Sequence, residues 1–103
     1  ACRVTGVVNP GLLNASHIKP WAHCNTNDER LDANNGLMLT PTIDHLFDKG
    51  FISFDHDGNL LFSEQLTASD KAMLNLEARI EAAPFSNEQI SYLNYHREHI
   101  LKF

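Results

Sequence analysis

The sequence predicts an α+β domain in which short strands and helices alternate along the chain. Two short apolar segments, 12–18 and 36–39, flank a polar stretch and lead into a helix-start signal at Thr40. An Asp-Gly pair between two further apolar segments, within 51–63, is typical of a β-hairpin. Apolar residues at helical spacing then continue towards the end of the chain. The expected order is strand, loop, strand, helix, hairpin and two helices.

Length and composition favour one folded domain. The chain has 103 residues, of which 43% are hydrophobic and 20% are charged, and domains most often contain roughly 100–150 residues. We therefore treat 1–103 as a single domain, with a core and hairpin at 1–63 and a helical tail at 64–103. The apolar runs are too short to span a membrane. Because the start lacks both Met and a signal-peptide pattern, we expect a fragment of a longer chain.

The charge balance and the cysteines exclude several classes of site. The chain has 8 Lys+Arg and 13 Asp+Glu, and 8 − 13 gives a net charge of −5. Broad nucleic-acid-binding surfaces carry a basic excess, so any contact with nucleic acid would be local or supplied by another domain. Cys2 and Cys24 form no CxxC pair, which excludes a four-thiolate zinc knuckle. We expect two reduced thiols in a cytoplasmic protein, with a Cys2–Cys24 disulfide as the alternative.

The polar stretch between the first two strands is the most unusual part of the sequence. We expect a strand at 12–18 that Pro20 ends, a loop over 20–35, and a second strand at 36–39. A loop of this length inside a compact domain is uncommon and usually functional. Trp21, at the start of the loop, is expected to pack in the core and not to act as a base-stacking platform.

The helix after the second strand has clear boundary signals. Thr40 can cap it, Pro41 suits its first position, and Gly50 can end it in a left-handed conformation. Its apolar face consists of three residues at helical spacing: Ile43, Leu46 and Phe47.

The tail is expected to contain two helices that Pro84 separates. The first spans 69–82, and its apolar residues are Ala72, Met73, Leu76 and Ile80. The second begins at a capping box formed by Ser86 and Gln89, and its apolar stripe includes Ile90, Leu93, Ile100 and Leu101. We interpret His96 and His99 on this helix as surface histidines.

Four short segments occur in a fixed order through the first half of the chain. They are Cys2 with Thr5-Gly6, the HIKPW segment at 17–21, the NGLML segment at 35–39, and LFD at 46–48 with Gly50 after it. Placed on a strand–loop–strand–helix pattern, they resemble an HNH endonuclease domain of the ββα-metal class, in the branch found in restriction-type nucleases. The similarity covers residues 2–63. It implies a ββα-metal core, here with an added hairpin and two C-terminal helices.

The resemblance implies hydrolysis of phosphodiester bonds and assigns roles to two residues. The family's first histidine, at the end of the first strand, is the general base that activates water, and His17 matches it. A histidine suits this role because its ordinary pKa is about 6.5. The family's central asparagine begins the second strand and orients the base, and Asn35 matches it.

The resemblance also implies a divalent metal, whose family ligand lies nine positions after that asparagine. Asp44 is the literal match, and His45 lies one position away. Their side chains point about 100° apart on a helix, so both cannot easily face one ion. We favour Asp44, because Mg²⁺ prefers carboxylate oxygens. Asp48, four residues further on, shares its face.

Ser16 stands where many family members carry a second metal-ligating Asp. A serine hydroxyl is a neutral and poorer ligand, so either the metal binds less tightly or another group, such as Asp48 or His17, supplies the bond. If His17 is that ligand, it cannot act as base. The implied metal is Mg²⁺, with Mn²⁺, Ni²⁺ and Zn²⁺ as alternatives. Lys19 and Arg30 are candidate phosphate contacts, with solvated surface charges as the alternative interpretation.

Together these implications predict a metal-dependent DNA endonuclease, the cleavage domain of a restriction or modification-dependent enzyme. The expected partners are DNA and an upstream DNA-recognition domain in the parent protein. A homodimer would supply the two active sites that double-strand cleavage needs, unless two nicks follow in succession. Ser16 and the displaced third ligand favour an alternative, a catalytically inactive ββα domain that binds DNA or protein. A third hypothesis is a structural or metal-storage domain in which His17 and Asp44 hold an ion.

Overall fold

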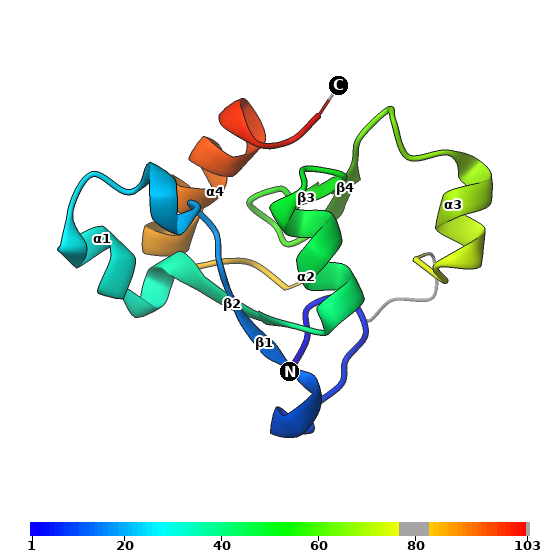
Figure 1. Cartoon of the computed structure of the whole chain (residues 1–103), viewed down its shortest axis with the longest axis horizontal. Coiled ribbons are helices and arrows are strands. Elements are labelled where there is room, and N and C mark those ends of the chain that lie inside the picture. Colours follow the sequence, from blue (N-terminus) through cyan, green and yellow to red (C-terminus); the bar gives the residue numbers. More distant parts are fainter. Residues whose placement is uncertain (77–82, 103) are drawn as a thin grey trace.

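The strand pair at the centre of the fold carries the candidate base. A computed structural model describes residues 1–76 and 83–102. Strand β1 (Asn14–His17) pairs antiparallel with β2 (Gly36–Leu39), and His17 lies opposite Gly36 in the register. Helix α2 (Pro41–Asp48) follows β2 almost directly and packs against β1. The expected strand–strand–helix order and the α+β class are confirmed (Figure 1).

The segment between β1 and β2 is not the loop that we expected. It contains the 3₁₀ turn η2 (Trp21–His23), helix α1 (Asn27–Leu31) and the 3₁₀ turn η3 (Ala33–Asn35). Thr26 caps α1 by accepting a hydrogen bond from the Glu29 N–H, and Asp32 caps η3 by accepting from the Asn34 N–H. The polar residues that suggested a loop are therefore helix caps in part.

Helix α2 ends as predicted, at a glycine that the fold requires. Gly50 has a φ of +76°, a conformation that other L-residues rarely adopt. A Cβ atom at this position would lie 1.9 Å from the carbonyl oxygen of Ile100. The end of α2 and the end of the chain thus pass very close to each other. Thr40 occupies the N-cap position of α2, but its side chain makes no capping hydrogen bond.

The hairpin is also confirmed, and it closes the core. Strands β3 (Ile52–Phe54) and β4 (Leu60–Phe62) pair antiparallel, and Gly58 in the connecting turn has a φ of +86°. Side chains from β2, β3, β4, α2, α4 and the segments between elements form one core cluster. Its largest fully buried apolar members are Phe47, Phe54, Ile18, Leu39, Ile52, Leu76 and Leu93.

The first tail helix is shorter than predicted. Helix α3 (Ala68–Met73) begins at a Thr67–Asp70 capping box and ends where Asn75 takes a φ of +56°. Met73 is 86% exposed, so its expected place on a buried face is wrong, because the helix stops before that face is built. Leu76 is buried beyond the helix end. The remainder of the expected helix, 77–82 with Ile80, lies outside the described residues.

The second tail helix, α4 (Asn87–His99), begins at the predicted Ser86 capping box. His96 is only 1% exposed, so its interpretation as a surface histidine is wrong. In Figure 1, α1 and α4 lie on one side of the β1–β2 pair and α3 lies on the opposite side. Within the described parts of the chain, no helix is both long and apolar enough to traverse a bilayer.

Candidate active site

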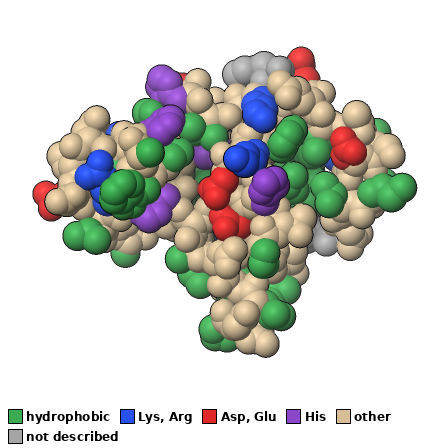
Figure 2. All heavy atoms as spheres, in the orientation of Figure 1, with side chains coloured by type: hydrophobic (Ala, Val, Ile, Leu, Met, Phe, Trp, Pro, Cys, Tyr) green, Lys and Arg blue, Asp and Glu red, His purple; other side chains and the backbone are tan. Residues whose placement is uncertain are grey.

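A cavity of about 270 Å³ opens between the end of β1, the start of η2 and one face of α2. Its lining residues are Ala15, Ser16, His17, Pro20, Trp21, Asp44 and Asp48. Figure 2 shows acidic side chains gathered near the centre of the face seen in this view. The cavity therefore brings the expected base, His17, together with two expected ligands, Asp44 and Asp48.

Two hydrogen bonds from β1 orient the carboxylates of α2. Asn14 Nδ2 donates to Asp44 Oδ2 over 3.1 Å, and Ser16 Oγ donates to Asp48 Oδ1 over 3.2 Å. The spacing of the two donors on β1 matches the spacing of the two acids on α2. Two residues along a strand advance about 6.7 Å, and four residues along a helix advance about 6.0 Å. Ser16 is thus placed as a hydrogen-bond donor that positions Asp48.

One oxygen of the carboxylate pair is left without a hydrogen bond. Among the described residues, Asp44 Oδ1 is the buried side-chain oxygen that has no hydrogen-bond partner. Partial burial raises the pKa of Asp48, and Asp44 raises it further, through its negative charge and by accepting a hydrogen bond from the protonated acid. The hydrogen bond from Ser16 opposes the shift. A buried, unpaired oxygen beside a second carboxylate is costly unless a cation or a proton compensates for it.

This donor set fits a hard divalent cation that keeps much of its hydration. Mg²⁺ is usually bound through one or two carboxylates, while water and substrate phosphates complete its octahedral shell. In residues 1–76 and 83–102, no group of three or more His, Cys, Asp or Glu side chains is placed to hold a metal ion. Asp44 and Asp48 would therefore hold the ion with the help of water and phosphate, and not as a closed protein cage.

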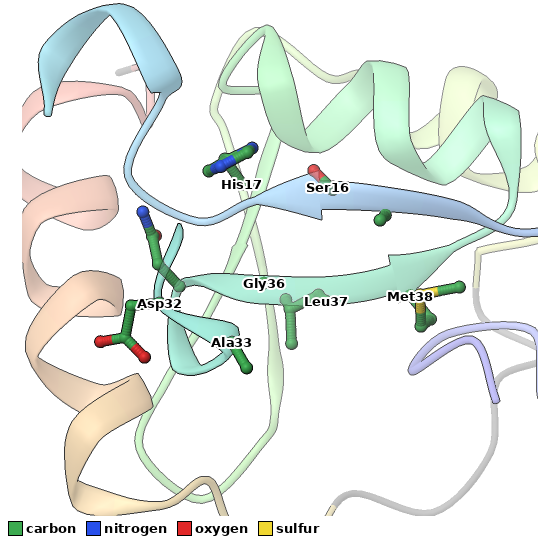
Figure 3. A pocket seen from close by; sticks show the side chains of 9 residues that line it. Ser16, His17, Asp32, Ala33, Gly36, Leu37 and Met38 are labelled. Atoms are coloured by element: carbon green, nitrogen blue, oxygen red, sulfur yellow. The ribbon is translucent and has the colours of Figure 1, made fainter. Parts of the chain in front are cut away.

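A main-chain contact orients the ring of His17 in the cavity. Its Nε2 atom lies 2.9 Å from the main-chain carbonyl oxygen of Arg30. A carbonyl oxygen only accepts, so in the neutral ring Nε2 carries the proton and Nδ1 is the atom that can take one up. Figure 3 shows His17 and Ser16 on the side of β1 that faces α2.

A second cavity, of about 310 Å³, adjoins the first (Figure 3). It shares Ala15, Ser16 and His17 with the first cavity and extends over η3 and β2. Its further carboxylate, Asp32, has a lowered pKa, because the Asn34 N–H and the hydroxyl of Tyr92 both donate to it. The second cavity therefore adds no unpaired acid to the site.

Asn35 is 1% exposed and holds the segment after His17 in place. Its Oδ1 accepts from the Lys19 N–H over 2.7 Å, and its Nδ2 donates to the carbonyl oxygens of Lys19 and Glu29, each over 3.2 Å. These contacts are with main chain that follows His17, and not with the imidazole itself. If Asn35 orients the base, it does so through the backbone.

Lys19 and Arg30 are both committed to contacts within the protein. Lys19 is nearly buried, and its Nζ lies 2.9 Å from Glu29 Oε2. Arg30 donates hydrogen bonds to the carbonyl oxygens of Trp21 and Cys24. Neither cation lines the cavity, so the structure does not bring either expected phosphate contact to the site. Each instead contacts the segment between β1 and β2, Lys19 through its ion pair with Glu29 and Arg30 through main-chain hydrogen bonds.

Two other predicted placements differ in outcome. His45 is exposed and does not line the cavity, whereas its neighbour Asp44 does. Trp21 is 60% exposed, so the expectation that it packs in the core is wrong. The reason is local, because the guanidinium of Arg30 lies 4.5 Å from the centre of its ring and supports it from one face.

Helix α4 makes hydrogen bonds to two parts of the chain that surround the site, the η3 segment and α2. Tyr92 donates a hydrogen bond to Asp32 over 2.8 Å, which raises the pKa of Tyr92 to about 12. His96 Nε2 donates to the carbonyl oxygen of Phe47 in α2, its Nδ1 accepts from Ser53, and its ring stacks on Phe47 at 3.8 Å. One helix thus fixes the η3 segment and the helix that carries the acids.

Sequence reasoning missed two parts of this arrangement. The role of Asn14 could have been found, because it lies two residues before Ser16 in the expected strand and so shares its face. The contact between His17 and the carbonyl oxygen of Arg30 could not have been found, because every residue has a main-chain carbonyl and the residue type does not show which one is used.

The geometry defines a strand-pair-and-helix site, in which a histidine at the end of the first strand faces carboxylates on the helix. A comparison with known families gives the same result, since residues 2–55 match the HNH endonuclease family. The chain belongs to this family, and the match covers just over half of its length. It includes β1, β2, α2 and β3, and leaves α3 and α4 outside. No curated protein sequence matches the chain.

Proposed function

We propose that this chain hydrolyses DNA phosphodiester bonds as a metal-dependent endonuclease, with His17 as general base and Asp44 and Asp48 as metal ligands. Membership of the HNH endonuclease family implies nuclease activity in general. The DNA substrate, the metal, the residue roles and a place in a restriction or modification-dependent enzyme are what the proposal adds.

In this mechanism His17 removes a proton from the water whose oxygen forms a bond to phosphorus. Nδ1 accepts that proton, because the carbonyl oxygen of Arg30 keeps the other proton on Nε2 and holds the ring in place. The bond from phosphorus to one of the two sugar oxygens breaks, and that oxygen leaves and takes up a proton from solvent. Asp44 and Asp48 would hold Mg²⁺, with Mn²⁺, Ni²⁺ or Zn²⁺ as alternatives. A bound cation supplies electrostatic stabilisation of the charge that develops on the phosphate oxygens.

The observation that supports this proposal most strongly is the unpaired Oδ1 of Asp44 in the same cavity as His17. Acids with a purely structural role are normally satisfied by donors within the protein. An unpaired carboxylate oxygen close to a base with a free Nδ1 instead favours a site that a cation and a substrate complete.

A plasmid assay tests the proposal. Supercoiled plasmid should be nicked or linearised with Mg²⁺ or Mn²⁺ and remain intact in EDTA. His17→Ala should slow cleavage about 10²–10⁴-fold, the usual contribution of a general base, while its circular dichroism spectrum is unchanged. His45→Ala is the matched control, because this exposed histidine lies outside the cavity, and it should cleave at the wild-type rate. Cleavage by His17→Ala at the wild-type rate would overturn the role of His17.

We further propose that much of the DNA affinity comes from another domain of the parent protein. The net charge of the chain is −5, and Lys19 and Arg30 are paired internally. Affinity for DNA normally depends on Lys and Arg contacts to phosphates, and it falls steeply with salt. DNA binding by this chain should therefore be weak and show a shallow dependence on salt, whereas the intact parent protein should bind more tightly. Tight binding by this chain alone would contradict the idea.

A further inference from the structure

Trp21 is the single tryptophan of the chain, and it lies exposed at the edge of the candidate active site. It is 60% exposed and lines the same cavity as His17 and Asp44. Other apolar side chains are more exposed, such as Leu31 and Met73, but neither lines this cavity. An aromatic ring that is left open beside reactive groups indicates a surface for a ligand.

The indole is held by Arg30, which also holds the candidate base. The Arg30 guanidinium lies 4.5 Å from the centre of the Trp21 ring, and its Nε donates to the carbonyl oxygen of Trp21 over 3.2 Å. Further hydrogen bonds to Asn27 and Cys24 fix the guanidinium. The carbonyl oxygen of the same Arg30 accepts from His17. Trp21 and His17 are therefore positioned relative to each other through one residue.

The chemistry of the open ring face selects the ligand. Arg30 covers one face of the indole, so a flat partner can stack on the other face. Nucleobases present such faces, and base–aromatic stacking tolerates any base sequence. In the interior of a duplex both faces of each base are already stacked on neighbours. A base can therefore reach Trp21 only where one face is free, as in a single strand, at a mismatch, at an end, or after rotation out of the helix.

We propose that Trp21 is a stacking platform for an unpaired DNA nucleobase. This base lies next to the phosphate that is attacked by the water that His17 deprotonates. This inference rests on the proposed function for the position of that phosphate. The inference extends the proposed function by naming the substrate class, which is DNA with an unstacked nucleotide at the cleavage site. Trp21 is accordingly a binding residue that places the substrate, and it takes no part in the proton transfer.

Fluorescence of the single tryptophan tests the stacking without requiring cleavage. The His17→Ala protein is titrated in EDTA with short oligothymidylate, with the same strand carrying abasic sites, and with a fully paired duplex of equal length. The base-containing single strand should quench the emission in a saturable manner, and both other probes should quench much less. Equal quenching by the abasic strand would overturn the platform, and equal quenching by the duplex would overturn the requirement for an unpaired base.

Kinetics on the wild-type background provide a second measurement. Trp21→Leu keeps an apolar side chain but removes the aromatic face, and it should raise the KM for single-stranded or mismatched DNA about tenfold, with kcat changed by less than about twofold. Trp21→Phe should restore most of the affinity. Met73→Ala is the matched control, because Met73 is exposed on α3 and does not line the cavity. A fall in kcat with unchanged KM would overturn the platform.

The two proposals fail in distinguishable ways. Quenching without cleavage under any metal would leave the platform standing and refute the nuclease activity. Cleavage that depends on His17 but is accompanied by no quenching, and by no effect of Trp21→Leu on KM, would refute the platform and leave the nuclease activity standing.

Discussion

The Nε2 atom of His17 lies 2.9 Å from the carbonyl oxygen of Arg30, and this contact sets both the orientation and the tautomer of the ring. The carbonyl belongs to α1, a short helix inside the segment that joins the two strands of the site. The orientation of the base thus depends on the backbone conformation of α1 and not directly on the side chains that α1 carries. Changes that unfold α1 should lower activity even where no cavity residue is altered.

Asp44→Asn should remove most of the metal-dependent stabilisation. A ligand present at about 100 times its Kd stabilises the folded state by about 2.7 kcal/mol if it does not bind the unfolded chain. The rise in Tm on adding Mg²⁺ or Mn²⁺ should be present in the wild-type protein and in His45→Ala, and nearly absent in Asp44→Asn. The reverse order of the two variants would make His45 the ligand.

Asp48→Asn should stabilise the metal-free protein at neutral pH. Burial and the charge of Asp44 raise the pKa of Asp48, so its ionisation opposes folding. The favourable contribution of the protonated acid is complete below its ordinary pKa of 3.8 and is lost as the pH rises through the higher value of the folded state. In denaturant unfolding in EDTA, the free energy of unfolding of the variant should increase relative to that of the wild type as the pH rises from about 4 to 7. A constant difference would contradict the coupling, and with metal present the order should reverse.

His96 should make the protein sensitive to mild acid. Burial lowers its pKa from 6.5 to about 4, so its contribution is present above pH 6.5 and is lost as the pH falls through about 4. The free energy of unfolding should decrease by about 3 kcal/mol over this interval from His96 alone. In His96→Gln this pH dependence should be reduced, with a loss at neutral pH of about 1–3 kcal/mol for the altered buried hydrogen bonds. An equally steep acid dependence in the variant would assign it to other groups.

Asn35→Ala should cost stability as well as activity. The truncation leaves the buried N–H of Lys19 and two carbonyl oxygens without their partner, at about 1–3 kcal/mol for each buried group left unpaired. Asn34→Ala is the matched control, because it keeps the main-chain N–H of Asn34, which makes the stronger of the two Asn34 contacts with Asp32. Urea unfolding of the two variants separates them, and a fully stable Asn35→Ala would show that the residue acts on chemistry alone.

Gly50→Ala should be among the most disruptive single-methyl changes in the chain. The positive φ of Gly50 alone costs another residue about 1–3 kcal/mol, and the added Cβ would meet the carbonyl oxygen of Ile100 at 1.9 Å. Gly11→Ala serves for comparison, since a Cβ there would meet Asn9 Oδ1 at an ordinary 3.4 Å. Thermal unfolding should show a large drop in Tm for Gly50→Ala and little change for Gly11→Ala.

Local signals allowed much of the fold to be predicted. Pro41 and Gly50 mark the ends of α2, the Asp57-Gly58 pair marks the hairpin turn, and Ser86 marks the start of α4. These features depend on backbone conformations that few residues favour. The segment between β1 and β2 was misjudged because Thr26 and Asp32 are common both in loops and at helix N-caps.

The environments of single side chains were harder to predict, since they depend on contacts between distant residues. His96 is buried because Ser53 and the carbonyl oxygen of Phe47 satisfy both ring nitrogens, and neither partner is close in sequence. Trp21 is exposed because Arg30 packs on its ring from within the same segment. The cavity likewise contains the predicted His17, Asp44 and Asp48, but Lys19 and Arg30 were drawn into internal contacts that residue type alone does not reveal.

The support that α4 gives to the site has a consequence for how this domain can be divided. The segment that matches the family ends at residue 55, whereas Tyr92 and His96 lie on a helix well beyond it. A protein engineer who transplanted only the matched segment would carry over His17, Asp44 and Asp48 but leave behind the helix that bonds to Asp32 and to the main chain of α2. A portable unit therefore has to include α4 as well as the family motif.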